Sequence, residues 1–469
     1  MANVETRSRR LALAVLCTGM LMIILDGTIV SVALPAVQSD LGFTPEGLAW
    51  TVNAYLVPLG GLLLLAGRLG DLYGRRRMLV TGLLLFVLAS LLCGLSVDAT
   101  MLVLARFGQG VAAAMASAVV LGMIAALFPE PTERARAIGV YAFVGAAGAS
   151  LGTLLGGLLT ETVGWRWIFL VNVPIGLLAA ALAVRTVPAD RPVRRARADV
   201  PGGLLVTAGL MVGVLAIVGE LGPAARLGLG AAALALLAAF LLRQHRTAEP
   251  LVALRVFGSR AVSGGNAAQL LMVAGMLGFQ FVGALYLQQV LGYRPTTTGL
   301  AMLPIPLLIA AVSLGVAGRA VARLGARRVL LGGQLLLVLG LLLLTGAPTG
   351  GYLLDLLPAF ALLGLGAGLA LPAVTTVIMS DAGPDDAGLV SGLANTSQQV
   401  GGALGVAVLA ALAAAVTQAA VVAGEPASAA LGSGFRLAFG AAAALVAAAT
   451  AVTVGVLRAA PRGAGLNLV

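Results

Sequence analysis

Long apolar runs recur from one end of this 469-residue chain to the other, and they restrict its fold more than any other feature. Each run is about 20 residues long, enough to cross a hydrocarbon core of about 30 Å as a helix. Charged residues make up 10% of the chain, whereas soluble domains hold about 25%. A β-barrel would instead show short segments of alternating polarity. We therefore expect an all-α polytopic membrane protein.

Hydropathy predicts fourteen transmembrane helices, and arginine placement predicts their orientation. With a cytoplasmic N-terminus, 24 of the 29 arginines lie at or beyond cytoplasmic helix ends, and Arg106 lies within the membrane. Because cytoplasmic loops are enriched in basic residues, both termini are expected in the cytoplasm. The predicted spans are residues 11–36, 48–68, 78–97, 100–127, 138–160, 167–187, 202–221, 227–242, 261–290, 298–318, 329–346, 353–378, 389–416 and 435–457.

Composition excludes several function classes. The net charge of +11 does not indicate a nucleic-acid partner, because the arginines lie in loops between spans. All basic residues are arginine, so a P-loop lysine and a Schiff-base lysine are both absent. His245 is the only histidine, which argues against a histidine-based metal site. Cys17 and Cys93 fall inside spans and are expected as free buried thiols. We expect no enzyme activity, no metal and no cofactor other than a coupling proton.

A parallel repeat divides the chain. Residues 41–45 (LGFTP) recur as residues 291–295 (LGYRP), and residues 67–77 recur as residues 318–328, at offsets of 250 and 251. Parallel repeats related by an axis along the membrane normal are one design of transporters, with the site between the halves. The expected domains are a six-helix bundle at 1–188, a linker with two extra helices at 189–260, and a second six-helix bundle at 261–469.

Asp26 is the strongest candidate for a functional residue. A carboxylate in the middle of a membrane helix costs roughly 2.5–3.5 kcal/mol on insertion scales, so its default interpretation is functional. Counted along their helices at about 1.5 Å per residue, Asp26 and Arg106 both fall in the outer half of the membrane. A pair that separates during transport would switch the proton affinity of Asp26. The alternative is a static ion pair that holds the two helices together.

Two glycine-containing segments are further candidates. The loop after the second span combines turn-forming glycines with an acid among arginines, a pattern that can form a charge cluster and latch one half to the other. The alternative is an ordinary basic loop. Its residues are Gly67, Arg68, Gly70, Asp71, Gly74, Arg75, Arg76 and Arg77. In the fifth span, Gly148, Gly152, Gly156 and Gly157 form a small-residue stripe that allows close helix packing.

These motifs resemble the major facilitator superfamily. The loop at 67–77 is similar to the family's G-x-L-[GA]-D-R-x-G-R-[KR] signature, except that Leu72 replaces a basic residue, and Ala322 replaces Asp71 in the second copy. Residues 25–35 (LDGTIVSVALP) resemble the fourteen-span drug:proton antiporter group, as do residues 165–176 and 287–293. The resemblance implies two six-helix bundles plus two extra central helices, a gating loop, and an Arg106 linked to proton transfer. Thr153 replaces the proline of the family's antiporter motif, which puts that label in doubt.

We therefore expect a proton-coupled antiporter for multidrug efflux, exporting amphipathic drugs, antibiotics or related metabolites by alternating access. The alternative is a proton-coupled symporter or facilitator that imports a small solute. The expected partners are a small amphipathic substrate and the lipid bilayer, for a monomer in the bacterial cytoplasmic membrane. With Asp26 as the only secure buried acid, neutral, zwitterionic or monocationic substrates are favoured. Polar residues that could line the cavity, or form interhelical hydrogen bonds instead, are Asn53, Tyr55, Gln109, Asn172, Asn266, Gln269, Gln280, Gln288, Gln289, Asn395 and Gln398.

Overall fold

The computed structural model describes residues 2–45, 47–188, 198–219, 221–346, 351–383 and 386–456. Of residues 2–8, 131, 132, 135, 142 and 146 it describes the backbone alone. All regular elements in these ranges are helical, and fourteen helical segments are long and apolar enough to cross a membrane. Each predicted span coincides with one of these segments, which confirms the polytopic all-α fold.

Every helical segment starts at or before its predicted span, whereas several end a few residues earlier than predicted, as α3 does at Gly94 and α8 at Val218. In chain order they are α1 (Ala2–Leu41), η1 (Gly47–Ala49), α2 (Trp50–Tyr73), α3 (Arg75–Gly94), α4 (Ala99–Leu127), α5 (Pro131–Thr162), α6 (Trp167–Leu170), α7 (Asn172–Thr186), α8 (Val200–Val218), α9 (Pro223–Arg246), η2 (Leu254–Gly258), α10 (Arg260–Gln289), α11 (Pro295–Met302), α12 (Pro304–Val312), η3 (Ser313–Ala317), α13 (Gly318–Leu324), α14 (Ala326–Thr345), η4 (Tyr352–Leu356), α15 (Leu357–Met379), α16 (Ala387–Val422) and α17 (Ala427–Gly455).

Local chemistry sets several helix boundaries. The carboxylate of Asp98 accepts the backbone N–H of Met101 at 2.8 Å and caps α4. Gly74 and Gly325 separate α2 from α3 and α13 from α14 with φ of 98° and 85°, a backbone conformation that side-chain-bearing residues rarely adopt. These two glycines are equivalent positions of the repeat.

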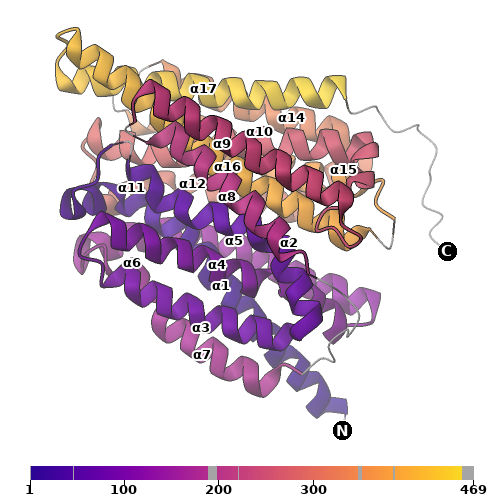
Figure 1. Cartoon of the computed structure of the whole chain (residues 1–469). Helices are drawn as coiled ribbons and strands as arrows, with labels where there is room; N and C mark the ends of the chain where they lie inside the picture. The colour runs from indigo at the N-terminus through magenta and orange to yellow at the C-terminus, as the bar shows by residue number, and fades with distance from the viewer. Residues whose placement is uncertain are drawn as a thin grey trace.

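The two bundles, which Figure 1 colours from indigo to magenta and from red-pink to yellow, have matching internal contacts. In the first bundle α1 packs against α5 and α7, and in the second α10 packs against α16 and α17. Likewise α3 packs against α4, and α14 against α15. We call the end of the molecule that carries Arg10, Arg75 and Arg328 the arginine-rich end, and the end that carries Leu41 and Gln289 the opposite end.

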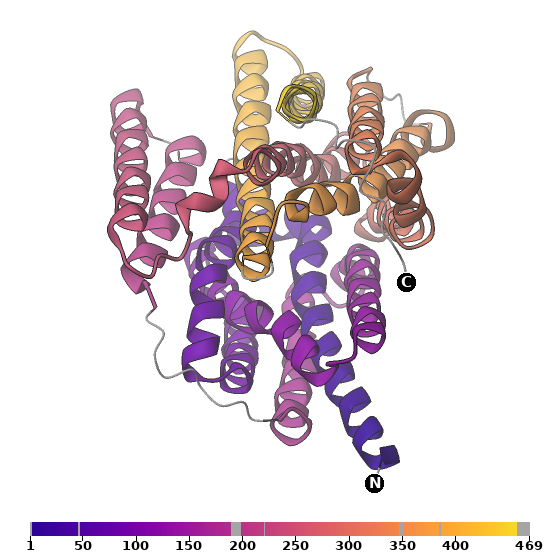
Figure 2. The ribbon, with the colours of Figure 1, turned by 90° about the vertical axis from the view of Figure 1, so that its right-hand side faces the viewer.

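The two extra helices are central in chain order but peripheral in space. Helix α8 packs on α2 and α16, and α9 packs on α8, so α9 forms the outer layer (Figure 2). The tenth span is divided into α11, α12, a π-helical turn at η3, and α13, and a second π-helical turn, η4, begins the twelfth span. Such π-turns inside helices frequently occur at functional sites.

Candidate functional site

Asp26 lies in the middle of α1 and is completely buried in the first bundle. Its Oδ2 atom accepts a hydrogen bond from Nη1 of Arg106 on α4 at 2.5 Å, and the Arg106 side chain is 1% exposed. The sequence-based expectation that these two residues lie close together therefore agrees with the geometry. A charge pair removed from water this completely requires further hydrogen bonds to be stable.

Amide side chains supply those further hydrogen bonds. Nε2 of Gln109 donates to Oδ1 of Asp26 at 2.8 Å, and Nδ2 of Asn172 donates to the same oxygen at 2.9 Å. Gln109 also donates to Oγ of Ser90 at 2.8 Å, and its Oε1 accepts Nη1 of Arg106 at 2.7 Å. The carboxylate thus has three donors from α4 and α7, and the network continues to α3.

The guanidinium of Arg106 is also held by α2 and by aromatic rings. Its Nε donates to the backbone oxygen of Thr51 at 2.8 Å. Its Cζ lies 4.4 Å from the ring centroid of Tyr55 and 5.7 Å from that of Phe169, a range in which a cation is attracted to an aromatic face. The hydroxyl of Tyr55 donates to the backbone oxygen of Ile23 on α1 at 3.1 Å. Residues of α1, α2, α3, α4, α6 and α7 therefore surround the Asp26–Arg106 pair.

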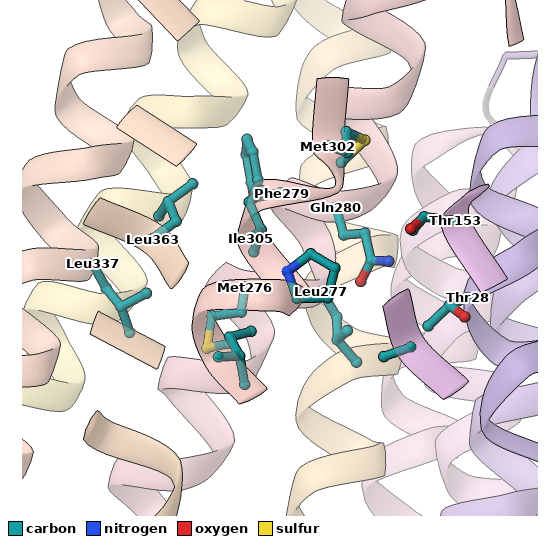
Figure 3. A pocket seen from close by; sticks show the side chains of 13 residues that line it. Thr28, Thr153, Met276, Leu277, Phe279, Gln280, Met302, Ile305, Leu337 and Leu363 are labelled. Carbon is teal, nitrogen blue, oxygen red and sulfur yellow. The ribbon is translucent and has the colours of Figure 1, made fainter. Parts of the chain in front are cut away.

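A cavity of about 110 Å³ lies between the two bundles. Figure 3 shows Thr28 and Thr153 of the first bundle on one side and Leu337 and Leu363 of the second bundle on the other. None of the thirteen lining residues is charged. They are Thr28, Ala149, Thr153, Met276, Leu277, Phe279, Gln280, Met302, Ile305, Pro306, Ile309, Leu337 and Leu363.

The cavity and the carboxylate lie on different faces of α1. Asp26 points into the first bundle, whereas Thr28 lines the cavity. Two residues of α-helix turn by about 200°, which places these side chains on nearly opposite faces. Helix α1 therefore connects the two sites, although they share no residue.

Most of the polar residues expected to line a cavity lie elsewhere. Gln280 alone among them lines this one. Tyr55, Gln109 and Asn172 belong to the Asp26 network, and Gln288 donates to the backbone oxygen of Val32 across the bundles at 2.9 Å. Asn266 is buried and accepts a hydrogen bond from the Ser397 hydroxyl, and Gln269 is also buried. Asn395 is exposed and Gln398 is half-buried. Gln289 donates to Gln38 at 3.2 Å.

Asn53 is fully buried, and neither atom of its amide has a hydrogen-bond partner among the described residues. Sequence reasoning missed Ser90 and Thr51 in the network, and it missed Thr28 and Thr153 in the cavity. Span-internal hydroxyls next to Asp26 were the one available signal, since Thr28 follows it by two residues.

The loop between α2 and α3 forms contacts within the first bundle and with the linker. Oδ1 of Asp71 accepts two hydrogen bonds from Arg75, one from Nη2 at 2.9 Å and one from Nε at 3.1 Å. Nη1 of Arg75 donates to the backbone oxygen of Gly122 at 3.2 Å. Arg68 pairs with Glu249 at 3.5 Å. These contacts tie the loop to α4 and to the segment after α9. A role as a gate between the two halves stays a prediction.

The remaining members of the loop complete this picture. Nη1 of Arg76 donates to the backbone oxygen of Val187 at 3.3 Å, and Arg77 is exposed. A Cβ on Gly67 would lie 4.0 Å from Cβ of Ala118, an ordinary contact, whereas one on Gly70 would collide with Val119. Gly70 therefore lets α2 approach α4 closely.

The glycine stripe of α5 lies against neighbouring helices at short distances, as the sequence predicts. A Cβ on Gly148 would lie 3.0 Å from Leu21, and one on Gly156 would lie 2.5 Å from the backbone oxygen of Ile29. Gly152 faces Thr28 of α1, whereas Gly157 faces Pro295 of α11 in the second bundle. The stripe thus serves both the α1–α5 crossing and the contact between bundles.

Comparisons with known proteins agree with this architecture. The chain is 42% identical over 405 residues to a puromycin resistance protein of Streptomyces alboniger, which covers 85% of this chain and 80% of the relative. It is 39% identical over 417 residues to a cephamycin export protein of Amycolatopsis lactamdurans, covering 86% of this chain and 85% of the relative. It is 35% identical over 408 residues to a tetracenomycin C resistance and export protein of Streptomyces glaucescens, covering 85% and 75%.

Solved structures share the fold at low identity. A bacterial homologue of the human lysosomal transporter Spinster, in an inward-facing conformation, superposes with a TM-score of 0.68 at 16% identity, covering 95% of this chain and 96% of that one. A nucleoside transporter superposes with a TM-score of 0.67 at 11% identity, covering 96% and 100%. The family model of the Major Facilitator Superfamily matches residues 16–406, and the chain belongs to that superfamily of transporters.

Proposed function

We propose that this protein is a proton-coupled exporter of amphipathic compounds, with Asp26 as the group that takes up and releases the proton. The observation that carries the proposal is the fully buried Asp26–Arg106 pair in the membrane interior. Ionisable groups at this depth usually mark proton or ion pathways. The relatives that export or confer resistance to antibiotics support the direction of transport.

Protonation of Asp26 would remove the negative charge that holds Arg106. The network at this carboxylate joins α1 to α4 and α7, so neutralising it weakens the attachment of α1 to the rest of its bundle. On its other face α1 carries Thr28 at the cavity, and its Val32 oxygen bonds Gln288 of the second bundle. We propose that α1 transmits the protonation state to the contact between bundles.

The arginine-rich end faces the cytoplasm in this proposal, as the basic loops require. A cavity of about 110 Å³ is smaller than the roughly 300–1,000 Å³ of drug-sized sites, so substrate loading requires the bundles to move apart. The uncharged lining suits neutral or weakly charged amphipaths, because an unpaired charge is costly to bury.

Transport into energised proteoliposomes tests the coupling. Puromycin and a panel of fluorescent amphipaths would be presented to the wild type, to Asp26→Asn and to Asp40→Asn. Asp40 is a matched control, since it lies on the same helix but pairs with Arg166 at the exposed opposite end at 2.6 Å. We expect Asp26→Asn to lose transport driven by a proton gradient and to keep substrate exchange without a gradient. Asp40→Asn should retain both.

Gradient-driven transport that survives in Asp26→Asn at the wild-type rate would refute the role of Asp26. Loss of exchange together with loss of driven transport, in protein that remains folded, would assign Asp26 a structural role instead.

A further inference from the structure

A groove of about 350 Å³ lies between α1 and α5, towards the arginine-rich end of the first bundle. It shares no residue with the cavity between the bundles. Eight residues line it, and the structure describes the side chains of all eight. Arg10 is the only charged residue among them, and five of the others are leucine, valine or alanine. The volume falls within the roughly 300–1,000 Å³ of ligand sites, so the groove is large enough to hold a ligand.

The groove faces the bilayer and not the second bundle. On α5 it is lined by Val140 and Val144. Leu151 follows Val144 by seven residues (151 − 144 = 7) and Leu158 follows Val140 by eighteen (158 − 140 = 18), so all four lie on one helix face. Val140, Leu151 and Leu158 are 43%, 42% and 44% exposed, as lipid-facing side chains of a span would be. The cavity residue Thr153 is thirteen residues from Val140 (153 − 140 = 13), about 220° around the helix.

Close helix packing closes the groove at its inner end. A Cβ on Gly148 would lie 3.0 Å from Leu21, and one on Gly152 would lie 3.0 Å from the backbone oxygen of Leu25, so α1 and α5 touch directly from this level onward. From Arg10 to Leu21 the chain advances eleven residues (21 − 10 = 11), a helical rise of about 16 Å. Half of a hydrocarbon core of about 30 Å is about 15 Å. The groove therefore has the depth of one bilayer leaflet.

The mouth of the groove is basic. Arg10 lines it, and Arg136 lies four residues before Val140 (140 − 136 = 4) on the same face of α5. Both arginines are exposed, and neither forms an ion pair with another side chain that the structure describes. Glu133, also exposed, lies a further turn away on that face. Two positive charges thus stand against one negative charge where the groove meets the membrane surface.

We infer that this groove binds one anionic phospholipid, with an acyl chain between α1 and α5 and the phosphate at Arg10 and Arg136. The apolar walls and the leaflet depth fit an acyl chain, and a guanidinium donates paired hydrogen bonds to a phosphate. A soluble anion would use the arginines but leave the apolar walls uncovered. In the orientation proposed above this end faces the cytoplasm, where basic pockets between helices bind anionic headgroups. The inference is independent of Asp26 and of proton coupling.

A lipid at this position would brace the first helix. Beyond Leu21, glycines let α5 pack on α1 at backbone distance, whereas along the groove the two helices leave a gap. The acyl chain fills that gap and the headgroup joins α1 to α5 through the two arginines. Bound lipid should therefore raise the thermal stability of the first bundle.

Native mass spectrometry of the detergent-purified full chain tests the site. Dioleoyl phosphatidylglycerol is the anionic probe, and dioleoyl phosphatidylcholine is the zwitterionic probe with the same chains. The variants are Arg10→Gln, Arg136→Gln and Arg185→Gln. Arg185 is a matched control, because it is an exposed arginine at the same end of the bundle, on α7, and does not line the groove. Phosphatidylglycerol with a diazirine in one acyl chain locates the bound lipid by cross-linking and peptide mapping.

We expect the wild type to bind one phosphatidylglycerol at least about tenfold more tightly than phosphatidylcholine, about 1.4 kcal/mol. Arg10→Gln should weaken phosphatidylglycerol binding about fivefold, or about 1 kcal/mol. Arg136→Gln should weaken it less, because Arg136 lies at the mouth and not in the lining, and Arg185→Gln should leave it unchanged. Cross-links should fall within residues 10–21 and 140–144. Phosphatidylglycerol should raise the melting temperature of the wild type more than that of Arg10→Gln.

A change of groove shape provides a second, charge-independent test. Ala14→Trp fills the groove with an indole ring and should weaken the binding of both lipids, since Ala14 lines it. Leu178→Trp, at another exposed position of the first bundle, should weaken neither. Each variant is first shown to elute as folded protein by size-exclusion chromatography.

Equal affinity for the two lipids would overturn the anionic assignment, as would an equal loss in Arg10→Gln and Arg185→Gln, which would indicate a diffuse surface charge. Cross-links outside α1 and α5 would reject the groove itself. Displacement of phosphatidylglycerol by puromycin would mean that the groove holds cargo and not lipid. All of these measurements are made without a proton gradient, so failure of the proposed coupling would leave them unchanged.

Discussion

The two bundles share a scaffold but differ in what fills it. In each, a glycine lets two helices cross at backbone distance: a Cβ on Gly156 would lie 2.5 Å from the oxygen of Ile29, and one on Gly278 would lie 2.8 Å from the oxygen of Gly405. The interiors are unlike. Gly82 and its repeat partner Gly333 make equivalent contacts with Ala116 and Ala370, an offset of 254, and at this offset Phe360 of the second bundle takes the place of Arg106 (360 − 106 = 254).

An aromatic cluster fills the second bundle where the first holds its polar network. Phe279 lies 6.2 Å from Phe360 and 5.9 Å from Phe439, and Tyr286 lies 5.4 Å from Phe439, between ring centroids. No charged side chain is buried in the part of this bundle that the structure describes. One scaffold thus supports either ionisable or apolar chemistry. Under the proposed function the bundles divide the work: the first holds the proton-binding group, and the second supplies most of the residues that line the cavity.

Of the substitutions that test this difference between the bundles, removal of Arg106 should lower stability most. Arg106→Gln leaves the Asp26 carboxylate buried without its counter-charge, and breaking a buried pair costs about 3–5 kcal/mol of stability. Thermal unfolding of the detergent-solubilised protein would measure the loss. The double variant Asp26→Asn/Arg106→Gln should recover much of it, since no charge is then left unpaired. An Arg106→Gln protein as stable as the wild type would show that the pair does not anchor the first bundle.

A substitution in the second bundle should have a smaller effect that is confined to stability. Phe439→Leu removes two ring contacts, each worth about 0.5–1.5 kcal/mol, so a loss of about 1–3 kcal/mol is expected. Proton-driven transport per folded molecule should not change, because Phe439 lines neither the cavity nor the Asp26 network. A change in proton dependence, measured in the same proteoliposome assay, would contradict the division of labour.

Much of the scaffold follows from sequence for physical reasons. Spans are predictable because every backbone group in a bilayer must be satisfied within its own helix. The pairing of Asp26 with Arg106 is predictable because two charges at similar depth have few other ways to be stabilised. The equal φ of 68° at Gly42 and Gly292 was likewise foreshadowed by the repeated loop motif.

The direction of polar side chains could not be predicted in the same way. For Gln109 and Asn172 the sequence left open a cavity position or an interhelical hydrogen bond, and in the structure both donate to the Asp26 carboxylate. A polar residue on a helix packed on all sides has several possible partners, and tertiary packing decides between them. The cavity itself is lined by residues such as Met276 and Leu363, whose apolar types do not distinguish a binding surface from ordinary core.

A second buried aspartate, at the end of a membrane span, can be compared with Asp26. Asp199 precedes α8, and its side chain is as inaccessible as that of Asp26, yet its partner Arg243 is 38% exposed, with Nε 2.5 Å from Oδ1. Gln244 and the N–H of Gly202 also donate to the carboxylate, at 2.8 and 3.0 Å. These bonds join the start of α8 to the end of α9, so we interpret them as a static clip for the hairpin.

Asp199→Asn should give the smallest effect, about 0.5–1 kcal/mol, because an exposed partner contributes little and the amide still accepts hydrogen bonds. Burial alone would raise the pKa of Asp199, but hydrogen bonds from Arg243, Gln244 and Gly202 outweigh it and hold the pKa below its ordinary value of 3.8. A lowered pKa stabilises the folded state above 3.8, and that stabilisation is lost as pH falls through the folded value. The wild type should therefore exceed Asp199→Asn in thermal stability at neutral pH, and the gap should close below pH 3.8. Proton-driven transport should be the same in both proteins, because the clip lies apart from the Asp26 network. A transport defect in Asp199→Asn would instead mean that the hairpin takes part in the transport cycle.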